Sequence, residues 1–233
     1  MAKKEKRKKL ETPLYAHDKP KSITSEKFRG IRSNIMFSGA NQEIKSIIVT
    51  SEKPAAGKSI VSANIAITYA QAGYKTLIID GDMRKPTQHY NFGVANYDGL
   101  SNLIVGKSDF EKSIRSTRVE NLDLLTSGPV PPNPSELIAS ERFEKLYKQL
   151  MEHYDFILID TPPVISVTDA QVFLQYIKDC VMVIDSERNN RNEIKKAKQL
   201  IEQAGGHIIG GVLNKTASEN SSSYYYYYGD DSK

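Results

Sequence analysis

The strongest constraint on the fold is the stretch Ser51–Ser59, which reads Ser-Glu-Lys-Pro-Ala-Ala-Gly-Lys-Ser. It follows the apolar, β-branched run Ile47–Thr50 and opens a helical pattern of apolar residues. A strand, a loop ending in Gly-Lys-Ser and a helix, in this order, are typical of a phosphate-binding loop. The unpaired N–H groups at a helix N-terminus attract anions, and Gly57 lets the backbone approach a phosphate. Lys58 adds a positive charge, and the hydroxyl of Ser59 can bind Mg²⁺.

The match of the loop to the usual pattern is imperfect. Glu52 stands six positions before Lys58, where the pattern has glycine, and alanines occupy positions 55 and 56, where related loops often have glycine. Gly-Lys-Ser is also a short match, and an ordinary helix start with a solvated lysine would carry the same letters. The loop by itself therefore leaves nucleotide binding and a plain helix start open.

The positive charge of the chain is concentrated at its beginning. Residues 1–10 hold six basic residues and Glu5, a net charge of +5, so the net charge of +4 for the whole chain leaves −1 for the rest. Bulk charge therefore argues against a body that binds nucleic acid, and we expect no nucleic-acid partner. The basic arm is interpreted as a solvated tail, with weak attraction to anionic lipid as the alternative.

Cysteine content and hydropathy indicate the reducing interior of the cell. Cys180 is the single cysteine, which excludes an internal disulfide. No apolar run of the sequence approaches the roughly 20 residues of a membrane span, and the first residues lack the apolar core of a signal peptide. We therefore expect a cytoplasmic protein.

Strand and helix patterns alternate through residues 22–215, which we predict to form one domain. Short, continuous apolar runs predict strands buried on both faces at 47–50, 76–80, 122–125, 156–160, 181–185 and 208–213. Helices are predicted at 22–37, 57–71, 135–151, 169–176 and 191–204, with short ones near 99–105 and 109–114. The alternation predicts an α/β fold, a parallel sheet with helices on both faces.

The two ends of the chain differ from this domain. Residues 1–21 are predicted to be a flexible, disordered basic arm, with Pro13 and Pro20 as breakers. Residues 216–233 contain three serines and then the uninterrupted tyrosine run Tyr224, Tyr225, Tyr226, Tyr227 and Tyr228. This low-complexity, tyrosine-rich tail is predicted to be disordered in isolation.

A polar stripe lies on the predicted helix 22–37. Glu26, Arg29 and Arg32 are three residues apart, away from the apolar face of the helix. Spacing alone favours a solvated face with one Glu–Arg pair, which contributes a few tenths of a kcal/mol. A contact with another subunit is the alternative.

Carboxylates end two of the predicted strands. Asp80 and Asp82 follow one strand, and Asp160 follows another. The carboxyl ends of parallel strands meet at one edge of a sheet, where ligands bind, and the Gly-Lys-Ser loop lies at the same edge. Carboxylate and hydroxyl oxygens suit Mg²⁺. Three such residues beside the loop are hard to explain as helix caps, so together they favour nucleotide binding.

At these residues the chain resembles the bacterial tyrosine kinases (BY-kinases). The loop 51–59, the strand end Asp80-x-Asp82-x-Arg84 and the strand end Asp160-Thr-Pro-Pro are similar to the three nucleotide motifs of that family. The tyrosine run resembles its autophosphorylated C-terminal cluster, and Glu26-x-x-Arg29-x-x-Arg32 resembles its oligomerisation motif, which replaces the solvated-face interpretation. The resemblance covers about residues 20–230 and is nearest to the capsular polysaccharide kinases of Gram-positive bacteria.

The resemblance implies a P-loop NTPase-like fold and an ATP-dependent, Mg²⁺-dependent protein-tyrosine kinase. Lys58, Asp80 and Asp82 would be catalytic, with Asp80 as the base or the orienter of the attacking tyrosine hydroxyl. Ser59, Asp80, Asp82 and Asp160 would support the metal. The implied ATP-binding set is Lys53, Pro54, Ala55, Ala56, Gly57, Lys58, Ser59, Ile60, Arg84 and Asn214. At position 55 the family usually has glycine, and Asn214 has a second interpretation as a turn residue at a strand end.

The resemblance also implies partners. They are a transmembrane modulator that acts through its cytoplasmic segment, further copies of this chain in a ring, a phosphotyrosine phosphatase, and polysaccharide-synthesis enzymes as substrates. The chain would then lie at the inner face of the cell membrane, held there by its modulator. It would phosphorylate its own tail in trans and regulate capsular or extracellular polysaccharide synthesis and export.

Two other functions remain open from the sequence. ParA/MinD-type ATPases share the expected fold and carry a lysine five residues before the main one, where Lys53 stands here. However, the Gly-Gly that usually follows that lysine is Pro54-Ala55, and those ATPases lack a tyrosine tail. The other alternative is a scaffold that binds nucleotide and recruits synthesis enzymes without catalysis.

Overall fold

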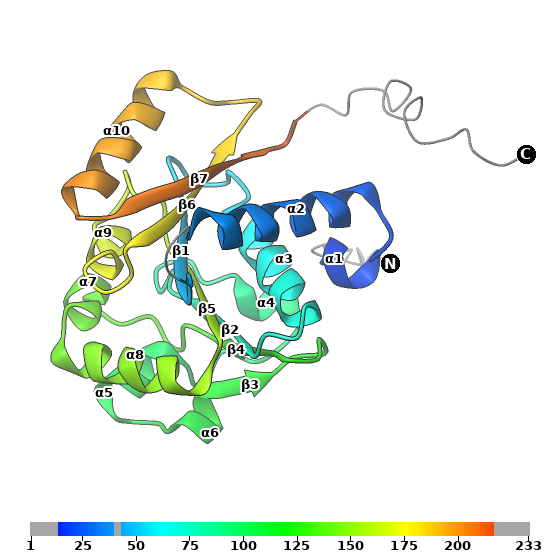
Figure 1. Cartoon of the computed structure of the whole chain (residues 1–233). Coiled ribbons are helices and arrows are strands. Elements are labelled where there is room, and N and C mark those ends of the chain that lie inside the picture. Colours follow the sequence, from blue (N-terminus) through cyan, green and yellow to red (C-terminus); the bar gives the residue numbers. More distant parts are fainter. Residues whose placement is uncertain (1–13, 40–42, 217–233) are drawn as a thin grey trace, which may run out of the picture.

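The computed structural model describes residues 14–39 and 43–216, and its elements are labelled in Figure 1. The predictions for residues 1–13 and for the tyrosine run lie outside the described residues. In the described part of the chain, strands form the centre of the molecule and helices lie on both sides of it (Figure 1). The fold is α/β, as the alternating sequence pattern predicts.

One seven-stranded sheet runs through the molecule in the order β3-β4-β2-β5-β1-β6-β7. The strands are β1 (Ser46–Ser51), β2 (Thr76–Asp80), β3 (Ile114–Ser116), β4 (Leu122–Leu125), β5 (Phe156–Asp160), β6 (Asp179–Asp185) and β7 (His207–Asn214). All neighbouring pairs are parallel except β3–β4, which is antiparallel at one edge. The order places β1, β2 and β5 next to one another, so the ends of these three strands share one site.

The helices divide between the two faces of this sheet. One face is covered by α1 (Tyr15–Asp18), α2 (Ile23–Ser38), α3 (Lys58–Gln71) and α4 (Gln88–Phe92). The other face carries α5 (Leu100–Val105), α6 (Phe110–Ser113), α7 (Pro134–Ile138), α8 (Glu141–His153), α9 (Asp169–Phe173) and α10 (Arg191–Gln203). Within the described ranges, no helix combines the length and the apolar character that crossing a bilayer requires.

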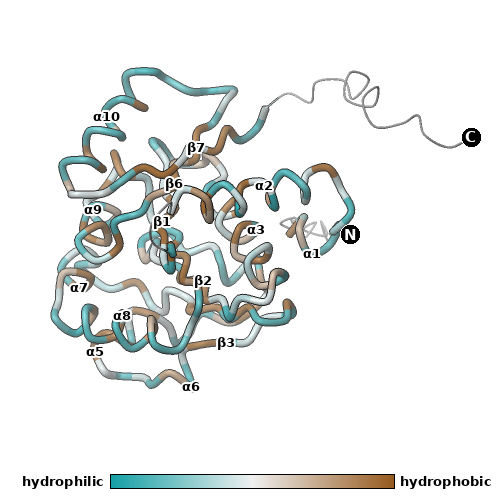
Figure 2. Tube along the Cα trace, viewed as in Figure 1, coloured by the Kyte–Doolittle hydropathy of each residue, from teal (hydrophilic) through white to brown (hydrophobic). Residues whose placement is uncertain are grey.

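Two hydrophobic cores result from the alternation of side chains along each strand. In β1, Ile47 and Val49 face α3, whereas Ile48 belongs to the core under α8 and α9. All three residues are fully buried. Figure 2 shows the same arrangement, with hydrophobic residues along the central strands and hydrophilic residues prominent on α10. Burial on both faces explains why these strands are continuously apolar in sequence.

The structure differs from the sequence prediction in several places. The segment assigned to a flexible arm is packed from Leu14 onward: Leu14 is buried, and Asn64 of α3 accepts a hydrogen bond from the backbone N–H of Ala16. One helix predicted at 135–151 is two helices, because Ser140 caps a new helix with its side chain. The antiparallel strand β3 and the short helix α4 were not predicted, since both are too short for a periodic signal.

Candidate active site

The phosphate loop joins β1 to α3 and ends in a tightly packed glycine. Gly57 has φ +89°, and a Cβ built there would lie 2.1 Å from the side-chain nitrogen of Asn214. Another residue at this position would be strained and would displace the end of β7. The sequence placed Gly57 here for close approach to a phosphate, and the structure adds close approach to β7.

Lys58 points into a cluster of carboxylates at the carboxyl edge of the sheet. Its ammonium lies 3.1 Å from Asp160 and 3.3 Å from Asp82, and only 8% of the residue is exposed. Burial by itself would lower the pKa of Lys58, but the charges of Asp160, Asp82 and Asp80 outweigh it and raise the pKa. The lysine is therefore a permanent cation beside the phosphate loop, 3.2 Å from the hydroxyl of Ser59.

Asp80 lies deepest in this cluster. One of its carboxylate oxygens accepts hydrogen bonds from the backbone N–H groups of Thr87 and Gln88 at the start of α4, each with an N···O distance of 2.9 Å. Its other oxygen is buried without a hydrogen-bond partner among the described residues. Burial and the nearby charge of Asp160 raise the pKa of Asp80 to about 8. The free oxygen suits a proton, a metal or a hydroxyl group.

Gln88 is a site residue that the sequence analysis missed. Its side-chain amide is fully buried and donates to Asp160 at 2.8 Å and to the backbone oxygen of Ser59 at 2.9 Å. Its own oxygen accepts a hydrogen bond from Asn91. Gln88 thus ties α4 to the phosphate loop and to the end of β5. A single glutamine in a loop-rich stretch carries no periodic or motif signal that would have revealed it.

Arg84, predicted to bind ATP, is held by Asp169 at the start of α9. Its guanidinium makes two hydrogen bonds to Asp169, at 2.9 and 3.0 Å, and Asp169 is fully buried. The Ser135 hydroxyl donates to the same carboxylate. The paired geometry fixes the strand end that carries Asp82 against α7 and α9.

The remaining residues of the phosphate loop face the end of β7 and the segment after β6. Ala56 is buried, and its carbonyl accepts a hydrogen bond from the side-chain amide of Asn214 at 2.9 Å. Asn214, predicted to bind ATP, therefore lies directly against the loop. The ammonium of Lys53 donates to the carbonyl of Arg188. Pro54 is exposed, whereas Ile60 lies half-buried in the first turn of α3.

Glu52 stands where the usual loop has glycine, and its side chain is fully buried. One of its carboxylate oxygens lies 3.9 Å from the ammonium of Lys53. Burial raises the pKa of Glu52 and so favours the neutral acid.

The described residues contain no cluster of three or more His, Cys, Asp or Glu side chains arranged to hold a metal ion. Protein-bound Mg²⁺ keeps several waters and takes one or two protein ligands together with nucleotide phosphates. The Ser59 hydroxyl, the free oxygen of Asp80 and the nearby Asp82 and Asp160 fit that requirement. The donors are oxygens of the kind Mg²⁺ prefers.

The three residues of the proposed oligomerisation motif are not equivalent. Glu26 is exposed on α2 and forms an ion pair with Arg29, which also donates to the carbonyl of Pro20 at 2.7 Å. Arg32 is half-buried and donates to the carbonyl of Thr68 in α3 at 2.7 Å. Within one chain, Arg32 therefore holds α2 on α3, Arg29 is half-buried against the segment before α2, and Glu26 is exposed.

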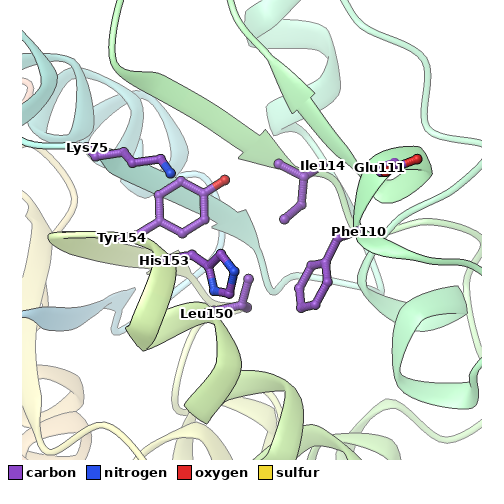
Figure 3. A pocket seen from close by; sticks show the side chains of 7 residues that line it. All are labelled: Lys75, Phe110, Glu111, Ile114, Leu150, His153 and Tyr154. Carbon is purple, nitrogen blue, oxygen red and sulfur yellow. The ribbon is translucent and has the colours of Figure 1, made fainter.

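A separate pocket of about 280 Å³ lies at the opposite, amino edge of the sheet (Figure 3). It is lined by Lys75, Phe110, Glu111, Ile114, Leu150, His153 and Tyr154. The ammonium of Lys75 sits 5.2 Å from the centre of the Tyr154 ring. Figure 3 shows Tyr154 and His153 on one side of the hollow and Phe110 and Ile114 on the other. No predicted site residue lines it.

Comparison with known proteins identifies relatives over nearly the whole chain. The AAA domain family matches residues 44–204. The protein of Staphylococcus aureus named "Putative tyrosine-protein kinase CapB" is 66% identical over 90% of this chain and 92% of its own. Tyrosine-protein kinase YwqD of Bacillus subtilis is 38% identical over 88% of this chain and 86% of its own. The crystal structure of the chimerical protein CapA2B2 is 57% identical, covers 87% of this chain and 89% of its own, and has a TM-score of 0.85.

A more distant likeness concerns the ATPase alternative. The septum site-determining protein MinD of Pyrococcus horikoshii, solved with Mg-ADP, is 27% identical over 72% of this chain and 69% of its own, with a TM-score of 0.61. Identity, coverage and TM-score are all lower than for the chimera. The similarity of the chain therefore lies with proteins named as kinases, on a fold that it shares with MinD.

Proposed function

This chain belongs to the bacterial tyrosine-protein kinase (BY-kinase) family, and we propose that it transfers the γ-phosphoryl group of ATP to tyrosines of its own C-terminal run, Tyr224–Tyr228, in trans. The observation that carries the proposal is the position of Lys58, buried between Asp82 and Asp160 at the mouth of the phosphate loop. Phosphoryl transfer needs mainly positioning and neutralisation of charge, and this cluster supplies both.

Each charged residue has a separate task in this proposal. Lys58 binds the β- and γ-phosphates, and Ser59 with the carboxylates of Asp82 and Asp160 holds Mg²⁺, which neutralises phosphate charge when bound. Asp80 accepts or orients the proton of the tyrosine hydroxyl. Burial and the charge of Asp160 raise the pKa of Asp80, which makes its carboxylate a stronger base than that of an ordinary aspartate.

The first experiment separates the kinase from its alternatives. The purified full chain is incubated with Mg·ATP, and phosphotyrosine is measured by mass spectrometry. A MinD-type switch would release ADP and phosphate without phosphotyrosine, and a nucleotide-binding scaffold would release neither. Phosphotyrosine that maps to residues 224–228 supports the proposal, and its absence under conditions of ATP turnover favours the switch.

Transfer in trans rests on the place of the tyrosine run in the chain. Tyr224 follows Asn214, the last residue of β7, by ten positions, so the run begins near its own active-site edge. Such a short connection must bend sharply to bring a hydroxyl in line with its own ATP, whereas a neighbouring subunit can present one with less bending. Five adjacent tyrosines also offer one active site several acceptors in turn.

Phosphorylation would also change the charge of the assembly. Each phosphate adds about −1.5 to −2 charges, so five add roughly −8 to −10 to a chain whose net charge is +4. Neighbouring tails and the aspartates of the site would then repel one another. We propose that this repulsion releases the tail and drives a cycle between ring and monomer.

The test of trans transfer mixes two variants, one without activity and one without the tyrosine run. Lys58→Met chains have the tyrosine run but lack activity, and chains without residues 224–228 have activity but lack the run. Phosphotyrosine on the Lys58→Met chains establishes transfer in trans. Its absence, with the intact protein still labelling itself, would mean transfer in cis. A ring that stays whole at full phosphorylation would remove the release mechanism alone.

Ring assembly is proposed through the exposed part of α2. Arginine and a carboxylate can pair with two hydrogen bonds, and a head-to-tail contact closes a ring at one rotation. Because Arg32 contacts Thr68 within the chain, Glu26→Ala with Arg29→Ala is the informative variant, and Arg32→Ala is made separately. We expect the double variant to be a folded monomer by light scattering. A double variant that keeps the mass of the wild-type assembly would place the contact elsewhere.

Regulation is proposed to come from a membrane partner. The family resemblance supports a transmembrane modulator whose cytoplasmic segment holds this kinase at the inner face of the membrane and favours the Mg·ATP-bound state. A phosphotyrosine phosphatase would reverse the tail modification, and enzymes of capsular or extracellular polysaccharide synthesis would be further substrates. Kinase rates measured across a panel of modulator tails test this, since rates that never change would contradict it.

A further inference from the structure

The phosphate loop passes through a backbone conformation that alanine rarely adopts. Ala55 has φ +62°, in the left-handed region, where glycine is unstrained and a Cβ is crowded. Among the described residues, the other non-glycine residues with positive φ are Asn121 and Lys215. Ala55 is also exposed, so packing around its side chain contributes little to holding it. A strained residue of this kind persists only where surrounding contacts compensate for the strain.

Lys215, the residue directly after β7, makes such a contact. Its ammonium donates a hydrogen bond to the carbonyl oxygen of Ala55 at 2.7 Å and another to a carboxylate oxygen of Asp185 at 2.8 Å. Asp185 is the last residue of β6 and is only 2% exposed. It also accepts hydrogen bonds from the backbone N–H groups of Glu187 and Arg188. The lysine therefore joins the strained point of the loop to a buried, well-fixed carboxylate.

The neighbouring contacts to the loop do not hold Ala55 itself. Asn214 donates to the carbonyl of Ala56, and Lys53 donates to the carbonyl of Arg188. Lys215 is thus the residue whose side chain acts on the peptide unit that follows the left-handed turn.

We propose that Lys215 is a positioning residue of the nucleotide site, which holds the carbonyl of Ala55 and so maintains the loop conformation that leads into Gly57 and Lys58. The inference rests on the proposed binding of nucleotide at this loop. It has a specific consequence: the requirement for lysine at 215 depends on alanine at 55, because glycine adopts positive φ without strain.

The test is a two-by-two set of full-length chains: wild type, Lys215→Met, Ala55→Gly and the double variant. Each is titrated with Mg·ADP, and the dissociation constant is measured by calorimetry. We expect Lys215→Met to weaken binding about tenfold, and the double variant to return to within about twofold of Ala55→Gly. Lys198→Met is the matched control for loss of one positive charge, because Lys198 is exposed on α10 and forms an ion pair with Glu202 of the same helix. Its affinity should equal that of the wild type.

Two results would overturn the inference. Lys215→Met that binds as tightly as wild type would show that the contact does not matter. A double variant as weak as Lys215→Met would show that the lysine acts on the nucleotide by its charge and not through the loop. Thermal unfolding checks that each variant is folded, and Lys215→Gln, which keeps a donor, replaces the methionine variant if that chain does not fold. Wild-type protein that fails to bind Mg·ADP would instead contradict the proposed function.

Discussion

Charged side chains are buried at one edge of the sheet and exposed at the other. At the carboxyl edge, Lys58, Asp80 and Asp160 are buried together, and the charge of Asp160 helps to raise the pKa of both Lys58 and Asp80. At the amino edge, Lys75 is exposed and lies over the ring of Tyr154, whose hydroxyl donates to Asp123 at 2.9 Å. At one edge the charged groups are largely buried, and at the other the cation remains solvated.

The difference shows that the groups needed for chemistry, at the carboxyl edge, lower the stability of the fold. A buried carboxylate with an unpartnered oxygen destabilises the folded protein, so such a group is expected mainly where a function requires it. A solvated lysine over an aromatic ring contributes about 0.5–1 kcal/mol and demands little of its surroundings. We therefore expect substitutions at the carboxyl edge to have large effects, some of opposite sign for activity and stability, and those at the amino edge to have small ones.

The largest effect is expected from Lys58→Met. Methionine keeps a flexible stem but removes the charge beside the phosphates, so phosphotyrosine formation should fall by more than about 100-fold while the chain still folds. Phosphotyrosine is measured at saturating Mg·ATP, with circular dichroism as the check on folding. Retained activity would refute the assignment of the site.

Asp80→Asn should separate activity from stability. The pKa of Asp80 is raised from 3.8 to about 8, so between these values the unfolded chain has lost a proton that the folded chain keeps, and stability falls as pH rises. The side-chain oxygen of asparagine can accept the same hydrogen bonds from the N–H groups of Thr87 and Gln88, and it carries no charge. At pH 7 without Mg²⁺ or nucleotide, we expect the free energy of unfolding to rise by on the order of 1–3 kcal/mol, while activity is lost.

Urea unfolding at several pH values measures this effect. The stabilisation should shrink as the pH falls and disappear well below 3.8, the ordinary pKa of the group, where both states of the wild-type protein hold the proton. A variant less stable than wild type at pH 7 would mean that the carboxylate is stabilising in the folded chain.

Gln88→Leu tests whether the buried amide supports the phosphate loop. Leucine has a similar volume but leaves Asp160 and the Ser59 carbonyl each without one donor, so we expect a loss of about 1–3 kcal/mol in stability. Mg·ADP affinity should fall with it, by roughly tenfold. The control is Gln175→Leu, an exposed glutamine that donates to the carbonyl of Ala204, where the stability change should stay within about 0.5 kcal/mol. Equal effects at both positions would contradict a role for Gln88.

Lys75→Met should have the smallest effect. It removes the cation over Tyr154 at the amino edge, which we expect to cost less than about 1 kcal/mol of stability and to leave the kinase rate within about twofold of wild type. It also serves as the charge-matched partner of Lys58→Met. A large loss of activity would end the contrast between the edges and assign a function to the pocket of Figure 3.

The sequence predicted the strands well, because continuous β-branched runs bounded by turns leave little choice of structure. β2, β4 and β5 begin and end at the predicted residues, and β1 and β7 differ by one residue at each end. The prediction was poorest where tertiary contacts override weak local signals: Leu14 packs into the core although it was assigned to a flexible arm, and Ser140 divides a predicted helix. α4 was also missed, although it supplies Gln88 and the N–H groups that hold Asp80.

The motifs that identify the family lie within short segments, so the sequence by itself determined the phosphate loop, the acidic strand ends and the kinase class. Tertiary structure decided which of these groups meet. Lys58 and Asp160 are 102 positions apart, and Lys215 and Ala55 are 160 apart. Their contacts depend on the strand order that brings β5 and β6 beside β1 and places β7 next to β6. Propensity and periodicity act over a few residues, whereas strand order follows from packing the whole chain around two cores, so no local pattern could have placed Gln88, turned Arg32 toward α3 or joined Lys215 to the phosphate loop.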